Sequence, residues 1–513
     1  MEPLVAALQD PACYPHPVAG VQLIETHISW VLLAGDYAYK IKKPVRFAFL
    51  DFSTLEARRR YCEEELRLNR RTAASYYLDV VGITQGDAGV RIAAAGQPVE
   101  YAVRMRRFPP GALAEDAARR GALDAAGIDA IAAAVAAFHA ETPRAGSGDA
   151  WGEPRDIAAQ ALANFDDIAA LAPSPGGADA ARLAFLRDWT RRACAELAPA
   201  FDARRAGGFV RECHGDLHLG NIAFVDGGAM PFDCIEFDPG LRWIDVVSEI
   251  AFLFMDLLAH RLHALAWRLL NAWLQESGDY AGVRLLRFYA VYRAMVRAKV
   301  ARLSGALDAA SGYIALADAL ARVEPHGLVL MHGVSGAGKT VASQALLEHL
   351  GAVRLRSDVE RKRLAGLAAQ ARAAAPPGAG IYDDRSTERT YERLAVLAAG
   401  ILESGWPAVV DAAFLQRAQR DALRGVAQRL RLPCAIAACE APEADLRRRI
   451  AAREAAAQDA SDAGIAVLER QLADREPLGE DEQRMAVRID TQDGNALRQG
   501  LEEIALRLAQ PGG

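Results

Sequence analysis

The order of hydrophobic and polar positions divides the chain into three parts: a beginning rich in short strands, a long helical stretch, and an end in which strands and helices alternate. Near the start, apolar runs of strand length lie at 21–24, 29–34 and 37–42. Gly35-Asp36, between the second run and the third, is a hairpin signal. We therefore expect two or three strands in this part.

Helical spacing begins after residue 50. The stretch 51–71 is strongly helical, and Ser53 followed by Glu56 three residues later indicates a capped start. One more strand is expected at 101–108, before a Pro-Pro-Gly hinge. Helices are then expected at 113–142, 152–172, 178–200 and over much of 246–322. Strands followed by helices predict an α+β unit.

Strands and helices alternate after Glu324-Pro325, which ends the helical stretch. Short buried strands are expected at 327–331, 352–356, 406–411, 434–439 and 485–490, with helices between them. This order predicts an α/β domain with a parallel sheet. The expected division of the chain is a small lobe at 1–112, a helical lobe at 113–324 and an α/β domain at 325–513.

A glycine-rich stretch separates the first strand of the α/β domain from its first helix. Its residues are Gly333, Val334, Ser335, Gly336, Ala337, Gly338, Lys339 and Thr340, which satisfy G-x-x-x-x-G-K-[ST]. In this motif backbone N–H groups surround the β-phosphate, Lys339 reaches the β- and γ-phosphates, and Thr340 holds Mg²⁺. A turn that binds nothing would not need Lys-Thr at its end. The stretch therefore predicts a site for ATP and Mg²⁺.

Composition narrows the class of protein. With 52% hydrophobic and 25% charged residues the chain is an ordinary globular protein, and its net charge of −6 disfavours a broad nucleic-acid surface. Seven cysteines without a C-x-x-C pair indicate reduced thiols. The start has no signal-peptide pattern, and the most apolar stretch, 246–274, is interrupted by Glu249, Asp256, His260 and Arg261. We expect a cytoplasmic protein that makes no use of a membrane.

Two lysines, Lys40 and Lys42, share one face of the third predicted strand. A strand lysine is the group with which a kinase small lobe holds the α- and β-phosphates, and a glutamate from the next helix, in the run Glu63 to Glu65, would orient it. A charged strand edge and a solvated helix face are the alternative interpretations.

The stretch 210–238 is dense in oxygen ligands for a metal. Asp216 and Asn221 have the spacing of the kinase motif H-R-D-x-x-x-x-N, in which Asp accepts the proton of the acceptor hydroxyl and Asn binds Mg²⁺. Asp233 follows 17 residues after Asp216 at the end of an apolar run, where a kinase has its Mg²⁺-binding aspartate. Glu236 is a further candidate ligand or water-orienting group.

His214-Gly-Asp-Leu-His-Leu-Gly-Asn221 with Phe232-Asp233 resembles the aminoglycoside phosphotransferase and choline-kinase-like branch of the protein kinase fold, over about residues 20–320. The resemblance implies Lys40 as the phosphate lysine, with Lys42 as its rival, and Glu65 as the helix partner. It also implies that Asp245 braces the catalytic loop. No G-x-G-x-x-G loop precedes Lys40, which departs from the protein kinase pattern.

In the α/β domain, further candidates follow predicted strands, where doubly wound sheets bind ligands. Asp358 is placed to accept a proton from an acceptor or to hold a metal-bound water, with a helix cap as the alternative. Asp411 can orient Mg²⁺ as a Walker-B-like group. Arg449 and Arg453, one helical turn apart, can close over the transferring phosphoryl group, or else form a solvated helix face.

Residues 326–510 resemble the P-loop small-molecule and polynucleotide kinases, including gluconate-kinase-like proteins, and the order of the two halves resembles a bacterial class described as a bifunctional aminoglycoside phosphotransferase and ATP-binding protein. The resemblance implies two kinases that use ATP and Mg²⁺ to phosphorylate small hydroxylated acceptors. Two alternatives stay open. One half is a regulatory nucleotide sensor, with the N-terminal half as the suspect, or the chain is a nucleic-acid-end kinase.

Overall fold

The computed structural model describes residues 1–47, 50–87, 89–146, 148–171, 177–369, 371, 380–456 and 464–510, with the side chains of 453–456 left out. By packing, these residues form two compact units. Unit 1 holds Met1–Asn164 and Thr190–Asp256, and unit 2 holds Phe165–Trp189 and the chain from Leu257 onward. Packing thus groups the last helices of the predicted helical lobe with the α/β part, while the proposed three-domain division stays a prediction.

Unit 1 begins with an antiparallel sheet of six strands in the order β1-β2-β3-β8-β6-β7. The strands are β1 (Val21–Glu25), β2 (Ser29–Ala34), β3 (Tyr37–Lys42), β6 (Tyr77–Gly86), β7 (Gly89–Ile92) and β8 (Pro98–Arg106). β4 (Arg46–Phe47) pairs antiparallel with β5 (Leu50–Asp51). The first three strands and β8 confirm the predicted pattern, whereas β6 and β7 were not predicted.

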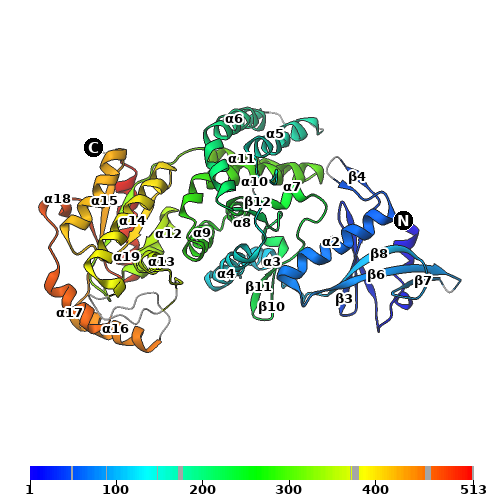
Figure 1. The fold of residues 1–513 in the computed structure, drawn as a ribbon, viewed down its shortest axis with the longest axis horizontal. Coiled ribbons are helices and arrows are strands. Elements are labelled where there is room, and N and C mark those ends of the chain that lie inside the picture. Colours follow the sequence, from blue (N-terminus) through cyan, green and yellow to red (C-terminus); the bar gives the residue numbers. More distant parts are fainter. Residues whose placement is uncertain are drawn as a thin grey trace. The chain divides into compact units, whose positions relative to one another are not determined.

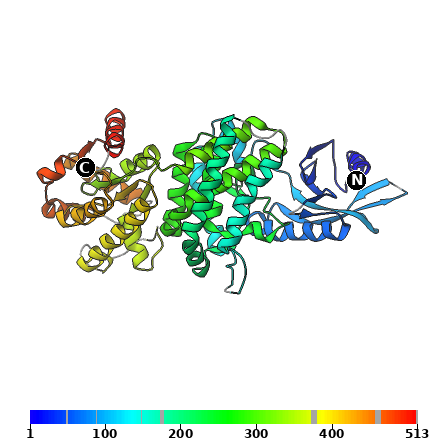
Figure 2. The same cartoon turned by 90° about the horizontal axis from the view of Figure 1, so that it is seen from above.

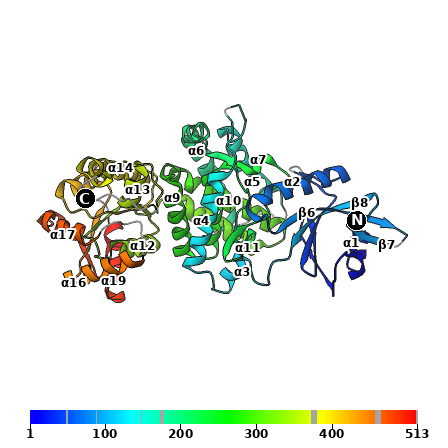
Figure 3. The same ribbon diagram turned by 60° about the horizontal axis from the view of Figure 1, so that its bottom comes forward.

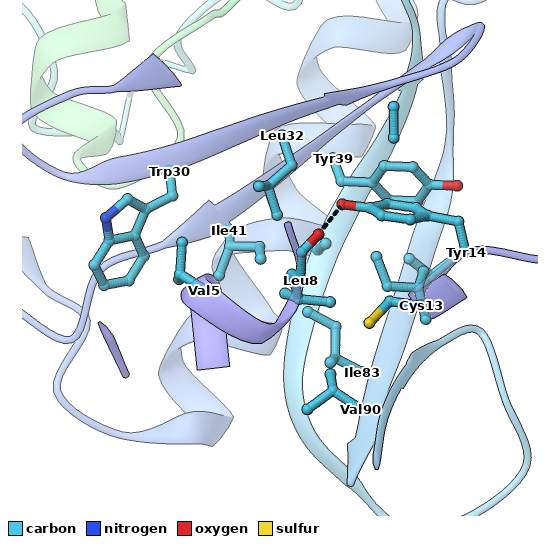
Figure 4. Close-up of a cluster of buried hydrophobic side chains, with 14 residues drawn as sticks. Val5, Leu8, Cys13, Tyr14, Trp30, Leu32, Tyr39, Ile41, Ile83 and Val90 are labelled. Carbon is cyan, nitrogen blue, oxygen red and sulfur yellow. Dashed lines mark hydrogen bonds between the residues drawn. The ribbon is translucent and has the colours of Figure 1, made fainter. Parts of the chain in front are cut away.

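Helices cover both faces of this sheet, as Figure 2 shows for the blue part of the chain. On one face lie α1 (Glu2–Ala7) and the 3-10 turn η1 (Pro11–Cys13), whose Val5, Leu8 and Tyr14 pack against strand residues such as Leu32 (Figure 4). The Tyr14 hydroxyl donates to Leu8 O at 2.8 Å. The other face is covered by α2 (Leu55–Ala73). Since β3 alternates between faces, Lys40 and Lys42 point toward α2.

The start of α2 corrects one prediction. Thr54, not Ser53, is the N-cap residue, and its hydroxyl accepts from the N–H of Ala57 at 3.1 Å. Ser53 instead bonds to Asp51, from its own N–H at 2.9 Å. The two residues are adjacent hydroxyl side chains, so the sequence pattern alone could not choose between them.

The rest of unit 1 is mostly helical and carries the predicted catalytic loop between short strands. Its elements are α3 (Ala114–Arg119), α4 (Ala125–Glu141), β9 (Val210–Glu212), η2 (Leu219–Asn221), β10 (Ile222–Val225), β11 (Gly228–Pro231), α7 (Pro239–Arg242) and β12 (Trp243–Asp245). The units divide within α5 (Pro154–Ala170), α6 (Gly177–Ala206) and α8 (Val246–Ala259). The expected helix at 113–142 is two helices, because Gly121 takes a left-handed φ of 67°.

Unit 2 contains a parallel sheet of five strands in the order β14-β15-β13-β16-β17. The strands are β13 (Leu328–His332), β14 (Val353–Arg356), β15 (Ala408–Asp411), β16 (Cys434–Cys439) and β17 (Ala486–Ile489). The helices after β13 are α12 (Lys339–Leu350), α13 (Ser357–Leu364), α14 (Asp384–Glu403), α15 (Arg417–Leu430), α16 (Glu443–Ala456), α17 (Ile465–Asp474), α18 (Glu480–Gln483) and α19 (Gly494–Leu508). In Figure 3, α13 and α14 lie on one side of the sheet and α12 and α19 on the other. The expected α/β domain is confirmed.

Three helices that precede the sheet in sequence also belong to unit 2. They are α9 (His263–Ser277), α10 (Val283–Leu303) and α11 (Leu307–Ala321), of which α10 and α11 pack side by side (Figure 1). In the described part of the chain no helix is both long and apolar enough for a membrane span.

Helix α9 is bonded to the edge of the parallel sheet through Asn271. Its side chain donates from Nδ2 to Ala352 O at 2.9 Å and accepts at Oδ1 from the N–H of Arg354 at 2.7 Å. These are backbone groups at β14, the outermost strand on that side. An amide side chain thus takes the place of a neighbouring strand. Because β14 leads directly to Asp358, the helix supports one wall of the predicted site.

We expect Asn271→Leu to lower the free energy of unfolding of unit 2 by about 2–4 kcal/mol, because two buried backbone groups lose their partners. Chemical denaturation of the full chain measures this loss. Asn164→Leu is the matched control, since that buried amide bonds only to carbonyls of its own helix, Gln160 O at 3.1 Å and Ala161 O at 3.4 Å. Equal losses in the two variants would show that the bonds to β14 contribute nothing.

Candidate functional sites

The predicted lysines and glutamate of unit 1 meet in one buried cluster. Glu65 lies on α2 with no exposed surface, and its two oxygens face different lysines: Oε1 is 3.0 Å from Lys40 Nζ and Oε2 is 2.8 Å from Lys42 Nζ. Lys40 also donates to Asp233, and Lys42 also donates to Glu236. The structure therefore brings both candidate lysines to the same glutamate and gives each a second carboxylate.

The predicted catalytic loop is closely tied to the segment that holds Asp233. Asn221 Nδ2 donates to Asp216 O at 2.9 Å and lies 3.3 Å from Asp216 Oδ2. His214 connects the two segments, because its Nε2 donates to Phe232 O at 2.7 Å while its Nδ1 accepts from the N–H of Asp216 at 3.3 Å. Asp216 and Asp233 are thus positioned by bonds to the same imidazole and its neighbours.

The backbone at Asp233 is unusual. Its φ is +64°, in the left-handed region that non-glycine residues seldom adopt, although Asp tolerates it better than most. The next residue is fixed from α2, because Asn69 Oδ1 accepts from the N–H of Cys234 at 2.9 Å. Asn69 was not predicted as part of the site. An unusual backbone conformation that neighbouring residues hold in place is typical of functional positions.

The residue that braces the catalytic loop is Glu249, which corrects the prediction for Asp245. Both oxygens of Glu249, on α8, accept from the N–H of His214, at 2.8 and 3.0 Å, and Oε2 also accepts from the N–H of Gly215 at 2.7 Å. Two turns further along α8, Asp256 accepts from the N–H of Leu219 at 2.9 Å. Asp245 instead accepts from Arg204 at 2.8 Å and caps α8.

Glu249 is fully buried and charged. Burial opposes its ionisation, but the nearby His139, 3.1 Å from Oε1, together with His214 and the N–H of Gly215, outweighs burial and holds the pKa of Glu249 at about 2. Cys213 also lies beside this pair. Burial, then the charges of Glu249 and Asp245, raise the pKa of the Cys213 thiol, so the thiolate that a metal requires is disfavoured there.

The oxygen groups of unit 1 suit a hard cation. The side chains of Asp233, Asn221 and Asp216 offer oxygen donors, the kind of ligand that Mg²⁺ prefers. Asp233 is the most accessible carboxylate of its cluster, with 38% of its side chain exposed. These residues would hold the metal that the sequence predicts.

In unit 2 the glycine-rich stretch forms a tight loop between β13 and α12. Gly333 has a φ of 142° and Gly338 a φ of 91°. A Cβ on the first would collide with Cys439 O, and one on the second with the Thr491 hydroxyl. Glycine is therefore required at both positions by conformation and by space.

Two groups of this loop, both predicted to face phosphate, have protein partners. Lys339 Nζ donates to Val334 O at 3.0 Å, and the N–H of Ser335 donates to Gln471 Oε1, on α17, at 2.7 Å. Each partner is a neutral oxygen. A phosphate oxygen carries more negative charge and forms the stronger hydrogen bond, so nucleotide binding can replace both.

A pocket of about 750 Å³ brings most of the candidates of unit 2 together. Lys339, Thr340, Asp358, Asp411 and Arg449 all line it. Asp411 ends β15 and accepts from the Ser343 hydroxyl at 3.0 Å. Thr340 and Asp411 supply oxygen ligands only, as Mg²⁺ requires. Ser343, which fixes Asp411 from α12, was not predicted.

Asp358 lies in the first turn of α13, directly after β14. Arg361, one turn later, lines the same pocket and donates to Ile381 O and the Thr387 hydroxyl, each at 3.0 Å. Among the described residues no carboxylate lies within ion-pair distance of Arg361. Asp358 and Arg361 thus line the same pocket, which is large enough for a small molecule.

Of the two arginines expected to close over the phosphoryl group, Arg449 and Arg453, only Arg449 has a side chain among the described residues. Arg449 donates to Gly336 O at 3.2 Å and lies 3.4 Å from the Thr491 hydroxyl, so its guanidinium already contacts the glycine-rich loop. Arg453 belongs to α16, but its side chain lies outside the described residues. The role of Arg453 stays a prediction.

The geometry defines the class of protein. A protein-kinase-like unit with a Lys–Glu pair and the loop His214-Gly215-Asp216, called the HGD loop below, is followed by a P-loop domain. The AAA domain family matches residues 328–478. An uncharacterised protein of Mycobacterium tuberculosis and one of Mycobacterium bovis are each 30% identical over 481 residues, which cover 91% of this chain and 93% of theirs. The chain belongs to the family of these mycobacterial proteins.

Solved structures resemble one half or the other. A choline/ethanolamine kinase family protein from Mesorhizobium loti is 14% identical, with a TM-score of 0.37, and the match covers 62% of this chain and 93% of that one. A thermostable mutant of an aminoglycoside phosphotransferase is 15% identical, with a TM-score of 0.38 and coverages of 60% and 95%. A gluconokinase from Sinorhizobium meliloti 1021 is 24% identical, with a TM-score of 0.26 and coverages of 36% and 97%.

The buried charge of Glu249 predicts a stability window. Because its folded pKa of about 2 lies below its ordinary value of 4.5, Glu249 stabilises the fold above pH 4.5, by about 3 kcal/mol, and this contribution disappears as the pH falls to about 2. We expect Glu249→Gln to lower the free energy of unfolding at pH 7. The difference from wild type should shrink between pH 4.5 and 2.

Denaturant titrations at a series of pH values measure this difference. Glu141→Gln, at an exposed position, is the control, and it should leave the pH profile unchanged. A Glu249→Gln profile that runs parallel to wild type through the acid range would show that the carboxylate is not held in its charged form.

Proposed function

We propose that each unit is an ATP- and Mg²⁺-dependent phosphotransferase that moves the γ-phosphoryl group of ATP to a hydroxyl of a small molecule. The observation that carries the proposal is the same in both units. A lysine for the phosphates, oxygen ligands for a divalent ion and a further carboxylate for the acceptor gather at Lys40, Asp233 and Asp216 in unit 1, and in the pocket around Lys339 in unit 2.

In unit 1, Asp216 would accept the proton of the acceptor hydroxyl. The hydroxyl oxygen would bond to the γ-phosphorus while the bond from the γ-phosphorus to the leaving ADP breaks. Lys40 would hold the phosphates, and Asp233 and Asn221 the Mg²⁺. Bound Mg²⁺ neutralises charge on the phosphates. Glu249 would keep the HGD loop in place by its bonds to backbone N–H groups.

In unit 2, Asp358 would act as the base, while Lys339 and Arg449 hold the β- and γ-phosphates and Thr340 and Asp411 hold Mg²⁺. Position supports Asp358 in this role, because it lies at the carboxyl end of β14, where acceptors of parallel sheets bind. Arg361 in the same pocket would contact the acceptor.

Small acceptors fit the observations better than polymers. The pocket of unit 2 has the volume of a small-molecule site, and the chain carries a net charge of −6. A cytoplasmic location is proposed as well, because all seven cysteines are unpaired. A nucleic-acid-end kinase would need binding to oligonucleotides that weakens as salt rises.

One observation favours a second candidate function for unit 1, that of a nucleotide sensor. The turn between β1 and β2, where a protein kinase has its glycine-rich loop, consists of residues 26–28 and is closed by the N–H of Thr26 on Ser29 O at 2.9 Å. So short a turn covers little of a triphosphate. A sensor would bind ATP at Lys40 without transferring its phosphoryl group.

Two substitutions in the full chain separate the sites. ATP consumption is measured over a panel of sugars, amino sugars, nucleosides and oligonucleotides. We expect Asp216→Asn to remove one acceptor-dependent activity and Lys339→Ala a different one, each by at least a hundredfold, because a base or a phosphate cation is lost. Removal of Mg²⁺ with a chelator should stop both.

Matched controls lie outside the sites. Asp226→Asn alters an exposed turn of unit 1 at a φ of 52°, which Asn tolerates, and Lys299→Ala alters a surface ion pair with Asp167 in unit 2. Both should keep full activity. If Lys339→Ala abolishes every activity and Asp216→Asn none, unit 1 is a sensor; if neither substitution has an effect, the proposal is wrong.

A further inference from the structure

Five charged side chains form a closed cluster in unit 1: Lys40, Lys42, Glu65, Asp233 and Glu236. The cluster contains two cations and three carboxylates. Four of its members are at least nine-tenths buried, and Lys42 has no exposed surface. Asp233 is the exception and opens to solvent. The sequence motifs assign roles to Lys40, Glu65 and Asp233, but they name Lys42 only as a rival of Lys40 and Glu236 only as a further candidate ligand.

The pairing within the cluster is specific. Lys42 lies between Glu65, at 2.8 Å, and Glu236, and its ammonium is 4.9 Å from the centre of the Phe52 ring. Lys40 lies 3.0 Å from Glu65 but donates its hydrogen bond to Asp233, and Glu65 Oε1 accepts no hydrogen bond. Lys40 is thus hydrogen-bonded to the residue predicted to bind the metal.

The charge balance of the cluster indicates a role for Lys42. When Mg²⁺ takes Asp233, two carboxylates, Glu65 and Glu236, remain for two lysines. Lys42 contacts both of them, so when Lys40 moves to the nucleotide phosphates a buried cation still faces the two carboxylates, which are left with a net charge of −1 instead of −2. Without Lys42, the ammonium of Lys40 would be the sole cation for two buried carboxylates. The attraction between the Lys40 ammonium and these two carboxylates would hold it in place, because the low polarity of the protein interior strengthens charge–charge interactions.

We propose that Lys42 is a positioning residue of unit 1: as the cation between Glu65 and Glu236 it releases Lys40 to exchange Asp233 for the phosphates of ATP. Lys42 itself cannot reach a nucleotide from its fully buried position, which settles the rivalry of the two lysines in favour of Lys40. Glu236 is then the counter-ion of Lys42 and not a metal ligand. The inference rests on the proposed nucleotide site of unit 1.

The test measures binding of Mg²⁺ and of ATP separately. All variants carry Lys339→Ala, so that only unit 1 is expected to bind nucleotide, and a non-hydrolysable ATP analogue and Mg²⁺ are titrated by calorimetry. We expect Lys42→Met to weaken analogue binding at least tenfold while Mg²⁺ binds as tightly as before or more tightly, because the cluster becomes more negative. Damage to the fold would weaken both.

Two further variants make the result decisive even if Lys42→Met fails to fold. Glu236→Gln alone should keep analogue binding within threefold of the parent, and Lys42→Met with Glu236→Gln should restore it to within threefold, because the cluster then regains the net charge of −1 that it has in the parent. Lys43→Met, which removes a neighbouring lysine paired with the exposed Glu25, is the matched control. It should change nothing.

Three outcomes overturn the inference. Loss of Mg²⁺ binding in Glu236→Gln would make Glu236 a metal ligand. Unchanged analogue binding in Lys42→Met, or no rescue by the double substitution, would remove the charge-balancing role while Lys40→Met still abolishes binding. If the parent itself binds no analogue, the proposed function of unit 1 fails, and this inference falls with it.

Discussion

A charge placed in a protein interior must meet an opposite charge, and this constraint organises unit 1. The sheet contributes two lysines, α2 contributes Glu65, and the segment after β11 contributes Asp233 and Glu236. No one of these elements could bury its charges alone. The same contacts that hold strand, helix and loop together therefore place a lysine next to the carboxylate that we propose as a metal ligand. Stability and site geometry share one set of interactions.

Unit 2 reaches a comparable arrangement mainly through backbone geometry. Glycines at Gly333 and Gly338 let the loop pass where any side chain would collide, and Ser343 fixes Asp411 below it. The wall with Asp358 depends on Asn271, from a helix that precedes the sheet by more than 50 residues. Helices α9 to α11 are therefore structural parts of the P-loop unit, and cutting the chain at residue 325 would leave the β14 edge unsatisfied.

The sequence predicted features that depend on local pattern. The first strands and the P-loop follow from periodicity and motif spacing, and the pairing of Lys40 with Glu65 follows from the family resemblance. It did not predict partners that only the fold brings together, such as Glu249 beneath the HGD loop or Gln471 on Ser335. A signal for Glu249 did exist, since a carboxylate inside the apolar stretch 246–274 must be paired. The choice of partner needed three-dimensional contacts.

The central claim is that the chain holds two separate nucleotide sites. The most direct measurement is a calorimetric titration of the full-length protein with a non-hydrolysable ATP analogue and Mg²⁺, which counts the molecules bound per chain. The account predicts two per chain, with one remaining after Lys339→Ala. One molecule bound to the wild-type chain would contradict the two-site account, and none would contradict both sites.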